Sequence, residues 1–310
     1  MKTSHAICLV GLLLTSLPSK THADLNGSDN FNDDFEDPAR WGMDFTQGVG
    51  GLLTETNGRL EFTTSSIPAP STLVVRPWIL NFGTYTQSWE AHIDASVPHL
   101  GFPETVFALG VSLGTNADFS NRFAIALFDS STGGRSFLMR LAINGGTDDR
   151  VAEFATTSTF AGLRIAFDAS TKVLSAYYDE DGPNCGYAWT LLGSTNISAA
   201  WTLTPTNLFR VWVQGRVEEQ DRLVTSADNL YADNFYASSG TVPNLGITLA
   251  GTKAVFAWST NGASCYPEFT TTLAPPVCWQ IGQEAPSIVG TNFTLTNTVS
   301  GGSRFYRLGR

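Results

Sequence analysis

Long apolar runs are missing from this sequence. The longest mostly apolar run, Ala6 to Leu17, has 12 residues, whereas a helix that spans a bilayer needs about 20. No later run approaches that length. The sequence therefore predicts no membrane span.

Histidine and the common catalytic motifs are also scarce. Of 4 histidines, only His92 and His99 lie beyond residue 23, which is too few for a histidine-rich metal centre. The sequence contains no Gly-x-Ser-x-Gly elbow for a serine nucleophile and no phosphate-binding glycine loop. It therefore offers little for serine-triad or nucleotide chemistry.

Basic residues are outnumbered by acidic ones. Lys and Arg total 18 against 28 Asp and Glu, which gives a formal net charge of −10. An acidic surface argues against nucleic acid and anionic lipid as partners and suits cations such as calcium. Charged residues are sparse while Thr, Ser, Gly and Asn are plentiful, a composition typical of β-sheets and turns.

A period of two is the main pattern that is present. Hydrophobic side chains alternate in Ser136–Ala142, Gly162–Asp168 and Phe209–Gln214, and turn signals such as Asn57-Gly58 separate these runs. No long segment shows a convincing 3.6-residue period. We therefore expect an all-β protein with two antiparallel sheets packed face to face.

Composition also divides the chain. Residues 1–23 have three features of a secretory signal peptide: a charged start, a short apolar run, and small residues at positions 21 and 23. They predict a secreted or cell-surface protein. Small and turn residues cluster at Ser238–Pro243. We expect a main β-sandwich domain at 24–240 and a small immunoglobulin-like β-module at 244–310.

Three cysteines follow the leader: Cys185, Cys265 and Cys278. Cys265 and Cys278 lie symmetrically about the turn at Thr271–Pro276, so a hairpin would place them opposite each other. Export would expose them to an oxidising environment. The sequence predicts a Cys265–Cys278 disulfide, with two thiols in a β-core as the alternative.

The order of the segments resembles the concanavalin A-like lectin/glucanase superfamily, including laminin G-like domains. Phe31–Trp41 looks like the first strand of such domains, Glu55–Phe62 like the turn into the second, and Tyr231–Ala237 like the last strand, which returns beside the first. The resemblance covers roughly residues 28–238. It implies a jelly-roll sandwich but defines no activity by itself.

The tail resembles short β-modules found at the ends of large secreted bacterial proteins. The matching pieces are Thr271–Pro276, Trp279 and Phe305–Leu308. This resemblance implies an accessory module rather than a catalytic one.

The resemblance also implies a calcium site. In family-16 glycoside hydrolases of this fold, a structural calcium joins the first strand, the turn before the second and the last strand. Carried over, its ligands would be the main-chain carbonyls of Asp34 and Gly58 and the carboxylate of Asp233, all oxygen ligands that calcium accepts. Asp34 stands where these enzymes often have proline. The alternative is that Asp233 caps a strand end and Asp34 is solvated.

Catalysis finds weaker support in the sequence. Retaining hydrolases of this superfamily carry Glu-x-Asp-x-x-Glu on one strand, because their two carboxyl groups must lie about 5–5.5 Å apart. The sequence has no match. Glu90, His92 and Asp94 would share one strand face, and we expect them to form an exposed polar face rather than an acid/base trio.

Sugar binding in β-sandwiches uses aromatic faces and polar side chains in a groove. Arg210, Trp212 and Gln214 share one strand face and are the predicted ligand-binding residues, although Trp212 would alternatively belong to the core. We therefore expect an exported, non-catalytic protein that binds an extracellular polysaccharide or acts as a surface scaffold. The alternatives are a polysaccharide-degrading enzyme with a diverged site and a structural or adhesive protein without a small ligand.

Overall fold

The computed structural model describes most of the chain from residue 27 onward. The described residues are 27–67, 71–79, 83–113, 120–146, 149–198, 200–201, 203, 208–219, 221–240, 243–260, 265–274, 277–281, 285–298 and 303–309. The signal peptide expected at residues 1–23 lies outside them. In this described part, no helix has the length and apolar character of a membrane span.

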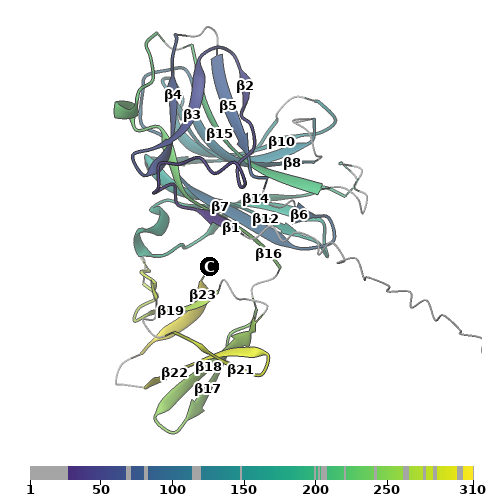
Figure 1. The fold of residues 1–310 in the computed structure, drawn as a ribbon, viewed down its shortest axis with the longest axis vertical. Coiled ribbons are helices and arrows are strands. Elements are labelled where there is room, and N and C mark those ends of the chain that lie inside the picture. Colours follow the sequence, from purple (N-terminus) through teal and green to yellow (C-terminus); the bar gives the residue numbers. More distant parts are fainter. Residues whose placement is uncertain are drawn as a thin grey trace, which may run out of the picture.

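Two large antiparallel sheets form the main domain (Figure 1). Sheet 1 has the order β14 (Thr190–Asn196), β13 (Val173–Asp179), β12 (Phe160–Asp168), β7 (Trp89–Ser96), β16 (Tyr231–Ser239), β4 (Arg59–Thr64) and β3 (Gly51–Thr56), with β1 (Gly27–Asp29) also beside β16. Sheet 2 has the order β11 (Asp149–Thr156), β10 (Gly134–Ala142), β9 (Arg122–Ser130), β8 (Thr105–Leu113), β15 (Leu208–Glu218), β5 (Ser71–Pro77) and β2 (Phe45–Gln47), with β6 (Gly83–Thr84) also beside β15. This architecture confirms the expected all-β sandwich of two antiparallel sheets.

Alternation along the strands builds the core between the sheets. Phe107, Leu109 and Val111 of β8 are fully buried and belong to one hydrophobic cluster with Leu163 and Ile165 of β12. Burial of each such side chain contributes about 1.5–3 kcal/mol to folding. The intervening residues of β8 consequently lie on the outer face of sheet 2.

The last strand returns beside the first, as the resemblance implied. Ser28 of β1 pairs with Tyr236 of β16. The first strand is nevertheless not Phe31–Trp41, because the chain turns there: Phe31 and Asp34 have φ of 51° and 53°. The Asp29 carboxylate holds this turn by accepting hydrogen bonds from the Phe31 amide (2.9 Å) and the Trp41 indole N–H (2.8 Å).

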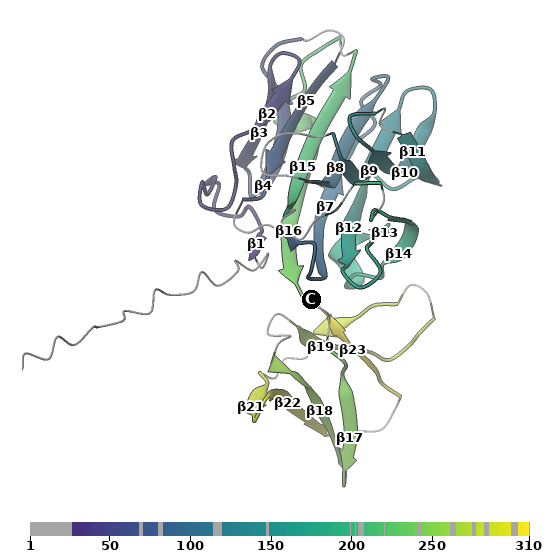
Figure 2. The same cartoon turned by 90° about the vertical axis from the view of Figure 1, so that its right-hand side faces the viewer.

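The C-terminal strands form two smaller sheets. Sheet 3 has the order β17 (Gly246–Ala250), β18 (Lys253–Ser259), β22 (Asn292–Thr298) and β21 (Ser287–Val289), and sheet 4 the order β20 (Gln280–Ile281), β19 (Tyr266–Thr270) and β23 (Phe305–Gly309). Phe256, Trp258, Cys265 and Leu295 are buried in their common core. Figures 1 and 2 show these strands beyond sheet 1, on the side away from sheet 2. We call residues 246–309 the C-terminal module; its immunoglobulin-like character stays a prediction.

The predicted Cys265–Cys278 disulfide is wrong. Cys278 is bonded to Cys185, which ends the short 3-10 helix η1 (Gly182–Cys185) of the main domain. The register explains the difference. Glu268 of β19 pairs with Ile281 of β20. Cys278 therefore lies before the first residue of β20, on the side of the turn, and does not face Cys265. The disulfide therefore joins the C-terminal module to the main domain.

Candidate functional site

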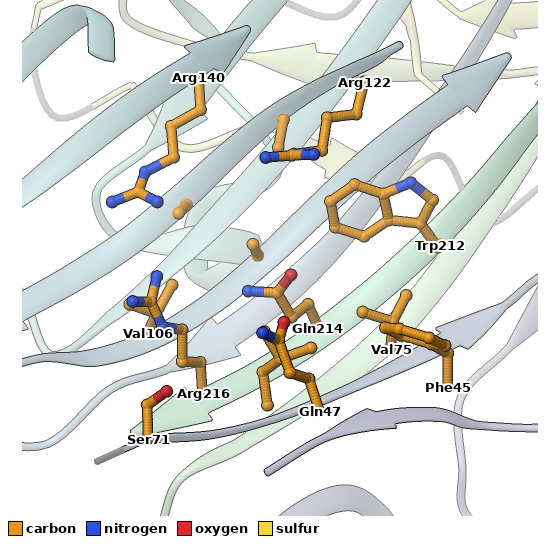
Figure 3. A pocket seen from close by; sticks show the side chains of 14 residues that line it. Phe45, Gln47, Ser71, Val75, Val106, Arg122, Arg140, Trp212, Gln214 and Arg216 are labelled. Atoms are coloured by element: carbon orange, nitrogen blue, oxygen red, sulfur yellow. The ribbon is translucent and has the colours of Figure 1, made fainter. Parts of the chain in front are cut away.

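A pocket of about 390 Å³ opens on the outer face of sheet 2 (Figure 3). Its side chains come from β2, β5, β8, β9, β10 and β15. In β5, β8, β9, β10 and β15 they occupy the positions that alternate with the core residues of the same strand, which is why they point away from sheet 1. Phe45 and Gln47 of β2 pair with Val75 and Leu73 of β5, which also line the pocket. We call this site the sheet 2 pocket.

Small residues make the floor of the sheet 2 pocket. Ala108, Ala124 and Ala126 line it, and the strand register places Gly110 between Ala124 of β9 and Trp212 of β15. A Cβ atom on Gly110 would overlap the indole ring of Trp212, so the ring lies directly over this glycine. Trp212 is only 2% exposed, and it is therefore a wall of the pocket rather than an open platform.

Polar and aromatic side chains surround this floor. Figure 3 shows Arg122 and Arg140 on one side of the pocket and Arg216 on the other, with Gln214 between them. Arg216 also forms ion pairs with Glu104 (3.5 Å) and Glu218. None of the described residues that line the pocket is Asp or Glu.

An exposed aromatic residue and a second amide complete the rim. Phe45 of β2 lines the pocket and is 41% exposed. Gln47, two residues along the same strand, lines it as well. The site thus combines one accessible aromatic ring with amide and guanidinium donors around an apolar floor.

Two of the three residues of the predicted strip on β15 line this site. Trp212 and Gln214 line the sheet 2 pocket, and Arg210 lies two residues before Trp212 on the same strand face. Burial lowers the pKa of the Arg210 guanidinium. The sequence did not single out the remaining polar and aromatic residues of the lining: Phe45, Gln47, Ser71, Arg122, Arg140 and Arg216. A signal existed for the three arginines, because each alternates with apolar positions of its strand, whereas the short strand that carries Phe45 and Gln47 is exposed throughout. Only the sheet order shows that these residues are neighbours.

Glu90, His92 and Asp94 share the outer face of β7, as expected, but the prediction that this face is exposed is wrong. All three side chains are buried. Tyr187 and Trp189, stacked at 4.6 Å, pack against the His92 ring, and the C-terminal module lies over the same face. The covering segment comes from elsewhere in the chain, so alternation within β7 did not reveal it.

Burial sets the chemistry of this trio. Burial lowers the pKa of His92 to about 4, against the raising effect of the Glu90 carboxylate and with a smaller lowering effect of Arg164, so the imidazole is neutral near pH 7. It raises the pKa of Asp94 to about 7, against the lowering effect of hydrogen bonds from Asn234 (2.8 Å) and Tyr187 (3.0 Å). Glu90 accepts hydrogen bonds from Arg164, through Nε at 3.1 Å and through Nη2.

A second, smaller pocket of about 170 Å³ lies where the trio meets the C-terminal module. Glu90, His92 and Arg164 line it from sheet 1, and Glu268 and Arg307 line it from the module. Arg307 pairs with Glu268 at 2.6 Å. Most of these charged groups are engaged with each other, which indicates a polar interface between the two parts of the chain.

The three segments of the implied calcium site do come together. The Asp34 carboxylate accepts a hydrogen bond from the Gly58 amide at 2.7 Å. Asp233 lies on β16, whose neighbouring residue Ala232 pairs with Leu60 of β4, just past this turn. Within the described residues, no three Asp, Glu, His or Cys side chains converge as a metal centre, so main-chain carbonyls would have to supply ligands.

Glu55 provides a test of whether a cation fits there. Its side chain is only 6% exposed. Burial, with Asp29 and Asp33 nearby, raises its pKa to about 8. A cation would compensate these clustered carboxylates, so the residues present fit calcium.

Comparison with known proteins gives similarities of fold alone. No family model matches the sequence, and no curated protein matches it. Among solved structures, winged bean acidic lectin complexed with methyl-α-D-galactose is 12% identical and covers 69% of this chain and 98% of its own, with a TM-score of 0.47. The potassium-bound carbohydrate recognition domain of Emp46p is also 12% identical, with coverage of 71% and 98% and a TM-score of 0.47. Metal-free lectin I-B4 from Griffonia simplicifolia is 14% identical, with coverage of 69% and 100% and a TM-score of 0.43.

Proposed function

We propose that this chain is an exported carbohydrate-binding protein that holds an extracellular glycan in the sheet 2 pocket. The observation that carries the proposal is the composition of that pocket: an apolar floor, the exposed ring of Phe45, and amide and guanidinium donors. A sugar ring has an apolar face that packs on aromatic rings and a hydroxyl edge that needs such donors. The acidic chain and the expected leader agree with export.

A glycan array with the purified protein tests this function. We expect binding to at least one polysaccharide, and about tenfold weaker binding for Phe45→Ala and Gln214→Ala, because each removes a contact with the sugar. Leu52→Ala is the matched control, since Leu52 is an exposed apolar residue of sheet 1. Binding to no glycan, or equal loss in the control, contradicts the proposal.

A reducing-sugar assay on the same samples separates binding from hydrolysis. Retaining and inverting glycosidases need a pair of carboxyl groups that flank the scissile bond. Release of reducing ends by the wild-type protein would replace the binding function with an enzymatic one. Neither binding nor release would leave a structural or adhesive role.

We also propose a structural calcium ion near Asp34, Gly58 and Asp233, with the buried carboxylate of Glu55 close by. Such an ion would stabilise three segments that are distant in sequence, because binding to the folded state alone shifts the unfolding equilibrium. Thermal unfolding with calcium and with a chelator measures the effect. An unchanged midpoint contradicts the calcium site and leaves the glycan site untouched.

A further inference from the structure

Every charged side chain that lines the sheet 2 pocket, among the described residues, is basic, although the whole chain is acidic. The chain carries a formal net charge of −10, yet Arg122, Arg140 and Arg216 line the pocket and none of its described lining residues is acidic. On a protein with only 18 basic residues, three arginines at one site form a local concentration of positive charge. This contrast bears on which glycan the site takes.

We propose that the ligand is an acidic polysaccharide whose carboxylate or sulfate groups are bound by Arg122, Arg140 and Arg216. The inference rests on the proposed glycan-binding function and names its substrate class. Planar guanidinium groups bind carboxylate and sulfate oxygens through paired, charge-assisted hydrogen bonds.

The spacing of the arginines favours a polymer over a single sugar. Arg122 is level with Arg210 across the sheet, because both positions pair with Ser112 of β8. Arg216 lies six residues further along β15, which corresponds to roughly 20 Å of strand. Charges repeated along a polysaccharide can meet both ends of this row at once, whereas one monosaccharide cannot.

Existing ion pairs are compatible with this role. Arg216 pairs with Glu104 and Glu218, which fixes its direction. Both ion pairs are made by Nη2 of Arg216, whereas a guanidinium has five N–H donors on three nitrogen atoms. Gln214 lies between the arginines (Figure 3), where its amide can meet sugar hydroxyl groups.

Matched pairs of polysaccharides test the proposal by titration calorimetry. Polygalacturonate is compared with its fully methyl-esterified form, which tests recognition of carboxylate groups. Dextran sulfate is compared with dextran, which tests recognition of sulfate groups. Within each pair the polymer backbone is the same and the charge differs. We expect binding to at least one acidic polymer, at least tenfold weaker binding to its neutral form, and weakening by added salt. Equal affinity for the charged and neutral forms overturns this inference but leaves glycan binding intact.

Variants assign the effect to the pocket. Arg122→Gln and Arg140→Gln should each weaken binding to the acidic polymer at least tenfold, and the lysine substitutions should retain part of it because they keep the charge. Arg304→Gln, an exposed arginine of the C-terminal module, removes the same charge elsewhere and should leave binding unchanged. Loss of binding in Phe45→Ala but not in the pocket-arginine variants overturns the arginine assignment, and failure of the wild type on every polysaccharide overturns the glycan function itself.

Discussion

Single residues decide how this fold responds to pH, and Asp94 is the clearest case. It is fully buried and its carboxylate accepts hydrogen bonds from Tyr187 and Asn234. Its pKa rises from an ordinary value of 3.8 to about 7 in the folded protein. The unfolded chain therefore gives up this proton at lower pH than the folded protein does, so Asp94 stabilises the fold below about pH 4 and that stability is lost as pH rises toward 7.

The Asp94→Asn variant should remove this pH dependence. An amide stays neutral at every pH, so the free energy of unfolding of the variant should fall less than that of the wild type between pH 4 and 7, by about 3 kcal/mol. Urea unfolding at several pH values measures the difference. His92 acts in the opposite direction, because its lowered pKa costs stability as pH falls from 6.5 toward 4. Parallel curves for the two proteins would contradict the role given to Asp94.

At the scale of elements, the sheet 2 pocket depends on a glycine in the middle of β8. Gly110 lies under the indole of Trp212, where any Cβ would overlap the ring. We expect Gly110→Ala to push the indole into the pocket and to cost about 1–3 kcal/mol of stability through overpacking. A change in tryptophan fluorescence together with weaker glycan binding measures this.

Gly134→Ala serves as the control for β8. Gly134 begins β10 and has no heavy atom near the position of a Cβ, although its φ of 77° disfavours a side chain. The control should lose stability without a fluorescence change. An unchanged Trp212 environment in Gly110→Ala would show that the pocket does not rely on this packing.

At the scale of the whole molecule, the Cys185–Cys278 disulfide closes a loop of 93 residues between the main domain and the C-terminal module. The backbone amide of Trp279 also donates a hydrogen bond to the Cys185 carbonyl at 2.6 Å. Cys278→Ser should therefore destabilise the docked arrangement by about 2–4 kcal/mol, since loops of this length gain most from a cross-link. Chemical unfolding of the oxidised protein measures the loss.

Peptide mapping without reduction checks the pairing itself. We expect one cross-linked peptide that contains positions 185 and 278, and the same loss of stability in Cys185→Ser as in Cys278→Ser. A cross-link that contains Cys265 would contradict the structure. In Cys265→Ser the disulfide should persist, because Cys265 lies in the core of the C-terminal module.

The sequence alone determined the features that depend on neighbours along the chain. Alternation in β8, β12 and β15 predicted the β class and the faces of the strands, and Asn57-Gly58 predicted the turn between β3 and β4, where both residues have positive φ. Trp212 and Gln214 were placed on one face by the same two-residue period.

Only the tertiary structure decided what lies across from those faces. The register of β19 places Cys278 away from Cys265. Glu90, His92 and Asp94 are buried because Tyr187, Trp189 and the C-terminal module cover them. The sheet order brings arginines from β9, β10 and β15 into one pocket. The physical reason is that a strand fixes the direction of its own side chains through local backbone geometry. Its partners, and hence burial, charge environment and binding site, follow from contacts between residues far apart in the sequence.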